Sequence, residues 1–91
     1  MVELHFQRPQ TFNRIMLQEY IPLGQRVERF HIDIFEETGW RTIAEETTIG
    51  YKRIVLTETV TAYKVRLVID QSRASIVLSR FGLFLDNIYK E

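Results

Sequence analysis

Paired carboxylates are the first feature of this sequence that could carry chemistry. Glu36–Glu37 and Glu45–Glu46 are neighbours in the chain, and hydrolysis of a glycosidic bond does use two carboxyl groups. That reaction places the two groups on either side of a cleft, typically about 5 to 9 Å apart. Adjacent glutamates at predicted turns are more simply explained as solvated loop charges. We therefore assign neither pair a catalytic role.

The two histidines do not form a metal-binding pattern. His5 and His31 are far apart in the sequence, and neither has a nearby cysteine or carboxylate at ligand spacing. The chain contains no cysteine, which excludes disulfides, thiolate catalysis and thiolate zinc sites. A G-x-S-x-G motif and a phosphate-binding glycine loop are also absent from the sequence. The sequence predicts no catalytic residue, no metal and no cofactor.

One glutamate sits where an apolar residue is expected. Glu19 shares a strand face with Ile15, Leu17 and Ile21, and an unpaired carboxylate on a buried face is costly to desolvate. Arg26 follows a short turn and would lie nearly opposite Glu19 if the strands on either side of the turn were paired. Because arginine can bind a carboxylate through two parallel hydrogen bonds, we predict a structural ion pair. A catalytic carboxylate is the alternative.

Aromatic and basic side chains near predicted turns could contact a sugar. Trp40 follows a turn, and its indole ring could stack on a pyranose or close one end of a β-sandwich. Charge-assisted hydrogen bonds to sugar hydroxyls could come from a basic group. The other candidates for sugar contact are Tyr51, Lys52 and Arg53, in the segment GYKR, and Arg73. The alternative interpretation of YKR is the start of a strand with a solvated basic face.

The elements that would position these residues are β-strands. Apolar and polar residues alternate with a period of two in most segments, which is typical of strands with one buried face. Residues 22–24 and 38–39 are turn signals. We expect the strands around the first turn to be antiparallel neighbours and those around the second to form a hairpin. The apolar segment 74–85 predicts a last strand with a bulge near Gly82.

The fold class follows from the number and spacing of these strands. The clearest one is YKVRLVID, residues 63–70, which places Tyr63, Val65, Leu67 and Ile69 on one face against Lys64, Arg66 and Asp70 on the other. Short strands separated by turn signals predict an all-β protein, an antiparallel β-sandwich or barrel. A chain of 91 residues is long enough for one domain with one core. We therefore expect residues 1–91 to form a single domain.

Charge and hydropathy argue against two classes of partner. Lysine plus arginine and aspartate plus glutamate number twelve each, so the formal net charge is zero. This balance provides no basic excess for binding the phosphates of nucleic acid. No apolar run approaches the roughly 20 residues of a membrane-spanning helix, and no signal segment follows Met1. We predict neither nucleic-acid binding nor membrane insertion.

Several segments, taken in order, resemble a known domain. They are FNRIMLQEYIPLGQRVERFHID, GW, IA, TTIGYKRI, VTAYKVRLVI and SRFGLF, and they closely resemble the C-terminal domain of bacterial α-L-fucosidases of glycoside hydrolase family 29. The resemblance covers about residues 12–84. It implies a jelly-roll, galactose-binding-like β-sandwich akin to discoidin or coagulation-factor type C modules. It also implies an N-terminally truncated version, because such modules usually begin with a further strand before VELHF.

The resemblance also implies where catalysis takes place. In that family the nucleophilic aspartate and its acid/base partner belong to a separate (β/α)₈ barrel upstream of this domain. The chain is then expected to be a non-catalytic accessory domain that packs against the barrel and therefore exposes an apolar patch. The alternative is a free-standing carbohydrate-binding module for galactose- or fucose-type sugars. A periplasmic or secreted location is implied by the family alone.

Overall fold

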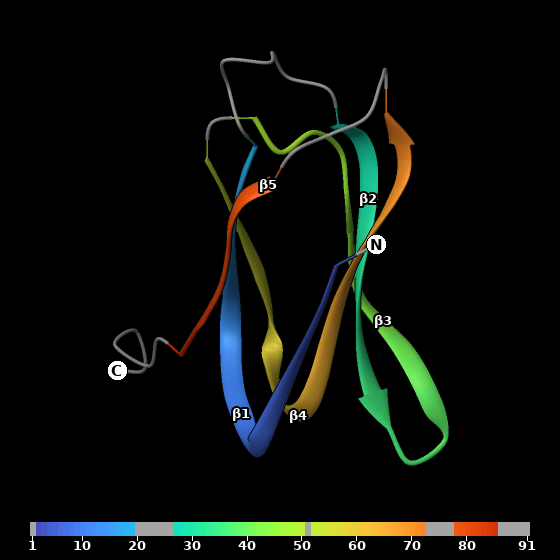
Figure 1. The fold of residues 1–91 in the computed structure, drawn as a ribbon, viewed down its shortest axis with the longest axis vertical. Helices are drawn as coiled ribbons and strands as arrows, with labels where there is room; N and C mark the ends of the chain where they lie inside the picture. Colours follow the sequence, from blue (N-terminus) through green and yellow to red (C-terminus); the bar gives the residue numbers. More distant parts are fainter. Residues whose placement is uncertain (1, 20–26, 51, 73–77, 86–91) are drawn as a thin grey trace.

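The chain folds into one antiparallel β-sheet. The structure, a computed structural model, describes residues 2–19, 27–50, 52–72 and 78–85. Within these ranges the sheet has five strands in the order β3-β2-β4-β1-β5 (Figure 1). The strands are β1 (Val2–Glu19), β2 (Val27–Glu36), β3 (Gly39–Glu46), β4 (Arg53–Ser72) and β5 (Leu78–Phe84). The predicted all-β class is confirmed. No helix in these ranges is long and apolar enough to cross a membrane.

Two long strands bend and thereby contribute to both layers of a sandwich. Residues 2–5 of β1 pair with residues 64–67 of β4, whereas residues 10–17 pair with residues 53–62, and the register shifts between the two stretches. Strands β2 and β3 extend the first layer, and β5 extends the second. Pro9 lies at the bend of β1, where regular pairing is interrupted and a missing N–H is tolerated. The sheet thus folds over onto itself (Figure 1).

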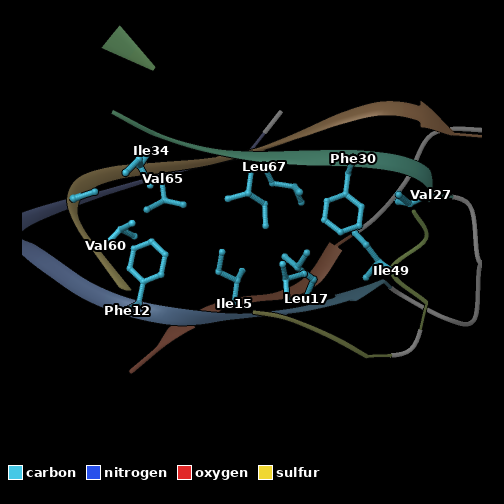
Figure 2. Packing of buried hydrophobic residues seen from close by; sticks show 13 residues of the cluster. Phe12, Ile15, Leu17, Val27, Phe30, Ile34, Ile49, Val60, Val65 and Leu67 are labelled. Atoms are coloured by element: carbon cyan, nitrogen blue, oxygen red, sulfur yellow. The ribbon is translucent and has the colours of Figure 1, made fainter. Parts of the chain in front are cut away.

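The hydrophobic core fills the space between the two layers. In Figure 2 the side chains that β1 contributes face those of β2 and of the second half of β4. Burial of such side chains stabilises the fold by about 1.5 to 3 kcal/mol each. The largest fully buried side chains are Phe12, Ile15, Leu17, Val27, Phe30, Ile32, Ile34, Val65 and Leu67. The alternation in the sequence therefore identifies the inner faces of these strands.

One predicted pairing is wrong. The strands on either side of residues 20–26, β1 and β2, are not neighbours in the sheet, because β4 lies between them. The 20-residue length of β4 explains this, since its residues 65–72 pair with β2 along one edge, whereas β1 pairs along the other edge with residues from 53 to 67. The end of β1 and the start of β2 consequently belong to facing layers of the sandwich.

The other two local predictions have different outcomes. The hairpin of β2 and β3 is confirmed: Glu36 pairs with Gly39, and Gly39 adopts a φ of 118°, which residues with a side chain rarely adopt. The bulge near Gly82 is wrong, because Gly82 pairs regularly with Met16. The register shift in β5 falls instead between the partners of Gln18 and Glu19.

Candidate functional site

Glu19 closes the end of the core at which β1 ends. Its side chain is buried, and its Oε2 accepts a hydrogen bond from the backbone N–H of Gly50 at 2.9 Å. Its Oε1 accepts one from the N–H of Val27 at 3.2 Å, and its own N–H donates to the carbonyl of Gly50. The carboxylate therefore joins β1 to the start of β2 and to the loop before β4. Arg26 lies outside the described residues, so the ion pair stays a prediction.

Arg53 supports the same loop from the start of β4. Its Nη1 donates to the backbone carbonyls of Thr47 and Thr48, at 3.0 and 3.2 Å, and its Nη2 donates to Oε1 of Glu46 at 2.6 Å. These contacts fix a turn that places Ile49 in the core. The guanidinium group is thus engaged in holding the loop that Glu19 also binds.

Trp40 lies at the opposite end of the sandwich, beside the β2–β3 turn. Its ring meets that of Phe35 edge to face, with centroids 5.2 Å apart and an interplanar angle of 73°. The guanidinium carbon of Arg66 lies 4.1 Å from the centroid of the indole ring, which is within cation–π distance. One face of the indole ring is therefore covered by a side chain of β4.

A buried carboxylate, that of Asp33, lies next to the Arg66 side chain that covers Trp40. Oδ1 of Asp33 accepts a hydrogen bond from the Thr42 hydroxyl at 2.6 Å, and Oδ2 accepts one from Nε of Arg66 at 2.8 Å. The His31 ring lies between Asp33 and Asp70, with nitrogen–oxygen distances of 3.4 and 2.8 Å. Burial by itself raises the pKa of Asp33, but these hydrogen bonds and the charges of His31 and Arg66 hold that pKa below its ordinary value.

Of the predicted sugar-contact residues, the structure describes Trp40, Lys52 and Arg53, and it does not bring these three together. Trp40 is at the hairpin end, whereas Arg53 and the exposed Lys52 are at the end that contains Glu19. Tyr51 and Arg73 lie outside the described residues. In the part of the chain that is described, no three His, Asp or Glu side chains are close enough to hold a metal ion.

A groove opens at the hairpin end, where the carboxylate pair Glu36–Glu37 and the turn that follows it lie. It encloses about 740 Å³ between the β2–β3 turn and the bends of β1 and β4, which lie at the lower end in Figure 1. Its aromatic residues, Phe35 and Tyr63, are 40% and 54% exposed. The lining residues are Pro9, Phe35, Glu36, Glu37, Thr38, Thr61, Ala62 and Tyr63. The sequence signals at this site are the Glu36–Glu37 pair, the turn at residues 38–39 and Pro9, which marks the bend.

A second exposed apolar region covers the outer side of the other layer. Ile15 of β1 is in the core and pairs with Val55 and Leu83, so the alternate positions on the three strands point outward. Beside Arg14 and Gly82, these positions carry apolar side chains, of which Ile54, Leu56 and Phe84 are 49%, 66% and 47% exposed. We call the set Met16, Ile54, Leu56 and Phe84 the outer apolar face.

Comparison with known proteins shows that the chain is similar to one part of larger proteins. No family model matches it. It is 46% identical over 77 residues to the inferred α-L-fucosidase 1 of Oryza sativa subsp. japonica, covering 85% of this chain and 15% of the rice protein. It is 32% identical over 87 residues to the α-L-fucosidase 1 of Arabidopsis thaliana, covering 91% of this chain and 17% of that protein.

Solved structures agree with the sequence comparison. The crystal structure of SpGH29 superposes with a TM-score of 0.89 at 35% sequence identity, over 93% of this chain and 19% of that one. The chain thus spans a fifth or less of the length of each of these three proteins. The expected resemblance is confirmed: the chain is a homologue of one segment of the α-L-fucosidases of glycoside hydrolase family 29.

Proposed function

We propose that the chain is a non-catalytic accessory domain of an α-L-fucosidase, C-terminal to the catalytic (β/α)₈ barrel and packed against it. Two facts support this role. The relatives are named as fucosidases, and the chain matches only 15% and 17% of their lengths. Buried carboxylates among the described residues are also committed to structural hydrogen bonds, as the partners of Glu19 and Asp33 illustrate.

The observation that carries the packing role is the outer apolar face. Ile54 and Leu56 are more exposed than most large apolar side chains, and contiguous exposed apolar surface commonly marks an interaction site. Met16 of β1 pairs with Ile54, and Phe84 of β5 lies across β1 from Leu56, so the surface continues across the layer. A domain that packs against a larger one needs such a surface, because interdomain contacts bury apolar area.

The charges around this face indicate the chemistry of the surface that it meets. Arg14 pairs with Leu56 and Phe84 and so lies within the face, and the exposed Arg80 pairs with Gln18 at its margin. Arg80 is positive. We therefore expect the opposing barrel surface to be apolar at its centre with a carboxylate opposite Arg80, because complementary charges fix the orientation of packed surfaces.

The test compares the 91-residue chain with a longer polypeptide that includes the catalytic barrel. Hydrogen exchange of the amides in residues 53–57 and 80–84 is expected to slow in the longer form if this face is covered. The double variant Ile54→Ser, Leu56→Ser should lower the stability of the interdomain contact by about 2 to 4 kcal/mol. Limited proteolysis should then separate the two domains more readily.

A matched control separates packing from general destabilisation. Tyr63→Ser removes an equally exposed apolar side chain from a different surface, and it should leave the interdomain contact unchanged. In the 91-residue chain the free energy of unfolding of both variants should stay within about 0.5 kcal/mol of that of the parent, as is usual for surface positions. Equal hydrogen exchange of the outer apolar face in the short and long forms would overturn the packing role.

The same role requires that the isolated domain lacks hydrolase activity. The 91-residue chain should not release nitrophenol from 4-nitrophenyl α-L-fucoside, whereas the longer polypeptide should. Turnover by the short chain that is lost in a Glu37→Gln variant would assign a catalytic carboxylate to the domain and contradict the proposal.

A second role, contact with glycan, is favoured by the groove at the hairpin end. Its volume, its exposed aromatic rings and its carboxylates are those of a small-molecule site. A free-standing carbohydrate-binding module for galactose- or fucose-type sugars would use such a groove, and an accessory domain could use it to hold part of a substrate.

A further inference from the structure

We propose that the groove at the hairpin end is a binding site for a neutral saccharide, with Tyr63 as the stacking surface and Glu37 as an acceptor for sugar hydroxyls. This inference rests on the glycan-contact role and is independent of the packing role. The groove and the outer apolar face together contain most of the exposed large apolar side chains among the described residues. Packing against the barrel through the outer apolar face leaves the groove unexplained.

The groove has the size of a small-molecule site, and ion pairs connect the elements that form one of its walls. Its volume of about 740 Å³ falls within the roughly 300 to 1,000 Å³ that is common for small-molecule sites. Arg41 of β3 connects two elements beside the groove. The Arg41 guanidinium binds both carboxylate oxygens of Glu36 at 3.0 Å and Oε2 of Glu58 at 2.9 Å. These bonds tie the hairpin to the first half of β4. A preformed site binds with less loss of conformational freedom.

Tyr63 is the aromatic ring that is available for stacking. The neighbouring ring of Phe35 is already engaged, because the Lys64 ammonium group lies 4.7 Å from its centroid and Trp40 meets it edge to face. Tyr63 is 54% exposed, and no ring contact or hydrogen bond of its side chain is recorded within the described ranges. An aromatic ring with one apolar face and a polar hydroxyl suits a ligand with both C–H and O–H groups.

The polar groups of the groove match hydroxyls. Glu36 is held by Arg41, but the adjacent Glu37 is exposed, and no partner of its carboxylate is recorded in the described part of the chain. An ionised carboxylate accepts hydrogen bonds at both oxygens and can bind two neighbouring hydroxyls. The Thr38 hydroxyl lies beside it in the turn and can donate or accept. Two adjacent hydroxyls on one ring are a feature of pyranose sugars.

The charge balance indicates a neutral ligand. Around this end of the sandwich Arg41 pairs with Glu36 and Glu58, and the Lys64 ammonium lies over Phe35, so the groups named here carry no excess of positive charge. A phosphate or sulfate ester would face the unpaired carboxylate of Glu37, and like charges at close range are unfavourable. A purely apolar ligand would leave that carboxylate desolvated, which is also costly. A neutral ligand rich in hydroxyls avoids both costs.

The experiment titrates the 91-residue chain with L-fucose, galactose and a fucosylated oligosaccharide. Binding is followed by ¹⁵N–¹H chemical-shift changes and by Trp40 fluorescence, because the Trp40 ring touches that of Phe35. A saturable response is expected, with shifts centred on residues 35–38 and 61–63. Tyr63→Ala should raise the dissociation constant about tenfold or more. Tyr63→Phe, which keeps the ring, should have a dissociation constant within about threefold of that of the parent.

Further variants locate the site. Glu37→Gln should weaken binding by about tenfold, because it removes a charge-assisted acceptor. Lys52→Ala and Leu56→Ser, at the other end and on the outer apolar face, should bind like the parent. The spectra of each variant show whether it is folded. Loss of binding by a folded Tyr63→Ala variant supports stacking only if Tyr63→Phe, which keeps the ring, still binds.

Three results would overturn the proposal. One is the absence of saturable shifts for all three sugars at up to about 100 mM, far above a millimolar dissociation constant. Another is saturable binding with shifts centred on the loop at residues 47–50. The third is stronger binding of a sulfated or uronic sugar than of its neutral analogue. None of these results bears on the outer apolar face, whose packing role is tested by hydrogen exchange in the longer polypeptide.

Discussion

The guanidinium group of Arg66 lies over the indole ring of Trp40, with its carbon 4.1 Å from the ring centroid. The same side chain donates from Nε to the buried carboxylate of Asp33 at 2.8 Å. Arg66 thus satisfies a carboxylate that is only 2% exposed and covers an aromatic ring at once. A planar guanidinium can do both, whereas the ammonium group of lysine cannot.

Loss of this arginine should therefore be costly. Arg66→Met keeps the aliphatic stem but leaves Asp33 without its arginine partner, so we expect the free energy of unfolding to fall by about 2 to 3 kcal/mol. Urea denaturation followed by far-UV circular dichroism measures this loss. Lys64→Met, which removes the neighbouring cation over Phe35, should cost less than about 1 kcal/mol. Equal losses for the two variants would contradict the assigned role of Arg66.

Asp33 should make the stability of the domain depend on acidic pH. Its pKa is lowered in the folded state, so the stability that its charge provides is present above the unfolded pKa, about 4, and is lost as pH falls through the folded pKa. The groups that face it are Thr42, Arg66 and His31, which also contacts Asp70.

The matching variant is Asp33→Asn. It should be less stable than the parent at pH 7, and the difference should narrow steadily as pH falls below about 4. Urea denaturation at a series of pH values measures both curves. A difference that stays constant from pH 7 to pH 2 would show that the Asp33 charge does not contribute.

Glu19 should be needed for stability rather than for activity. Glu19→Gln exchanges an acceptor oxygen for an NH₂ group, so one of the two N–H groups that it binds, those of Val27 and Gly50, loses its acceptor. We expect a loss of about 2 to 4 kcal/mol, since hydrogen bonds to a charged group are strong and the site is buried. Glu45→Gln, at an exposed position, should be nearly neutral. Full stability of Glu19→Gln would refute the structural role.

The sequence predicted the local features of the fold better than its long-range pairing. Alternating residues such as Ile15 and Leu17 are buried as expected, and Gly39 ends a hairpin turn. Turn signals indicate that two strands lie close together, but they do not indicate whether the strands share a layer. Consequently β1 and β2 were assigned as neighbours, although β4 separates them.

The groove also could not be predicted from the sequence, because it depends on where a strand bends. Tyr63 follows the same alternation as Val65 and Leu67, yet it is exposed, because the inward-facing positions of β4 change at the bend, from Val60 and Ala62 to Val65 and Leu67. Phe35 and Tyr63 are 28 residues apart in the sequence, and only the bend brings them to one groove. Alternation identifies a face of a strand, but it does not indicate where that face leaves the core.

Replacement by alanine should destabilise the fold more at Gly39 than at Gly82, although there is more free space around Gly39. A Cβ on Gly39 would meet nothing within 4 Å, but the residue holds a φ of 118°, so Gly39→Ala should cost about 1 to 3 kcal/mol through backbone strain. A Cβ on Gly82 would lie 3.3 Å from the Phe84 ring. Because that ring is about half exposed and can turn aside, Gly82→Ala should cost less than about 1 kcal/mol. Thermal unfolding of both variants decides the order, and a larger loss for Gly82→Ala would mean that Phe84 is fixed on the outer apolar face even in the isolated chain.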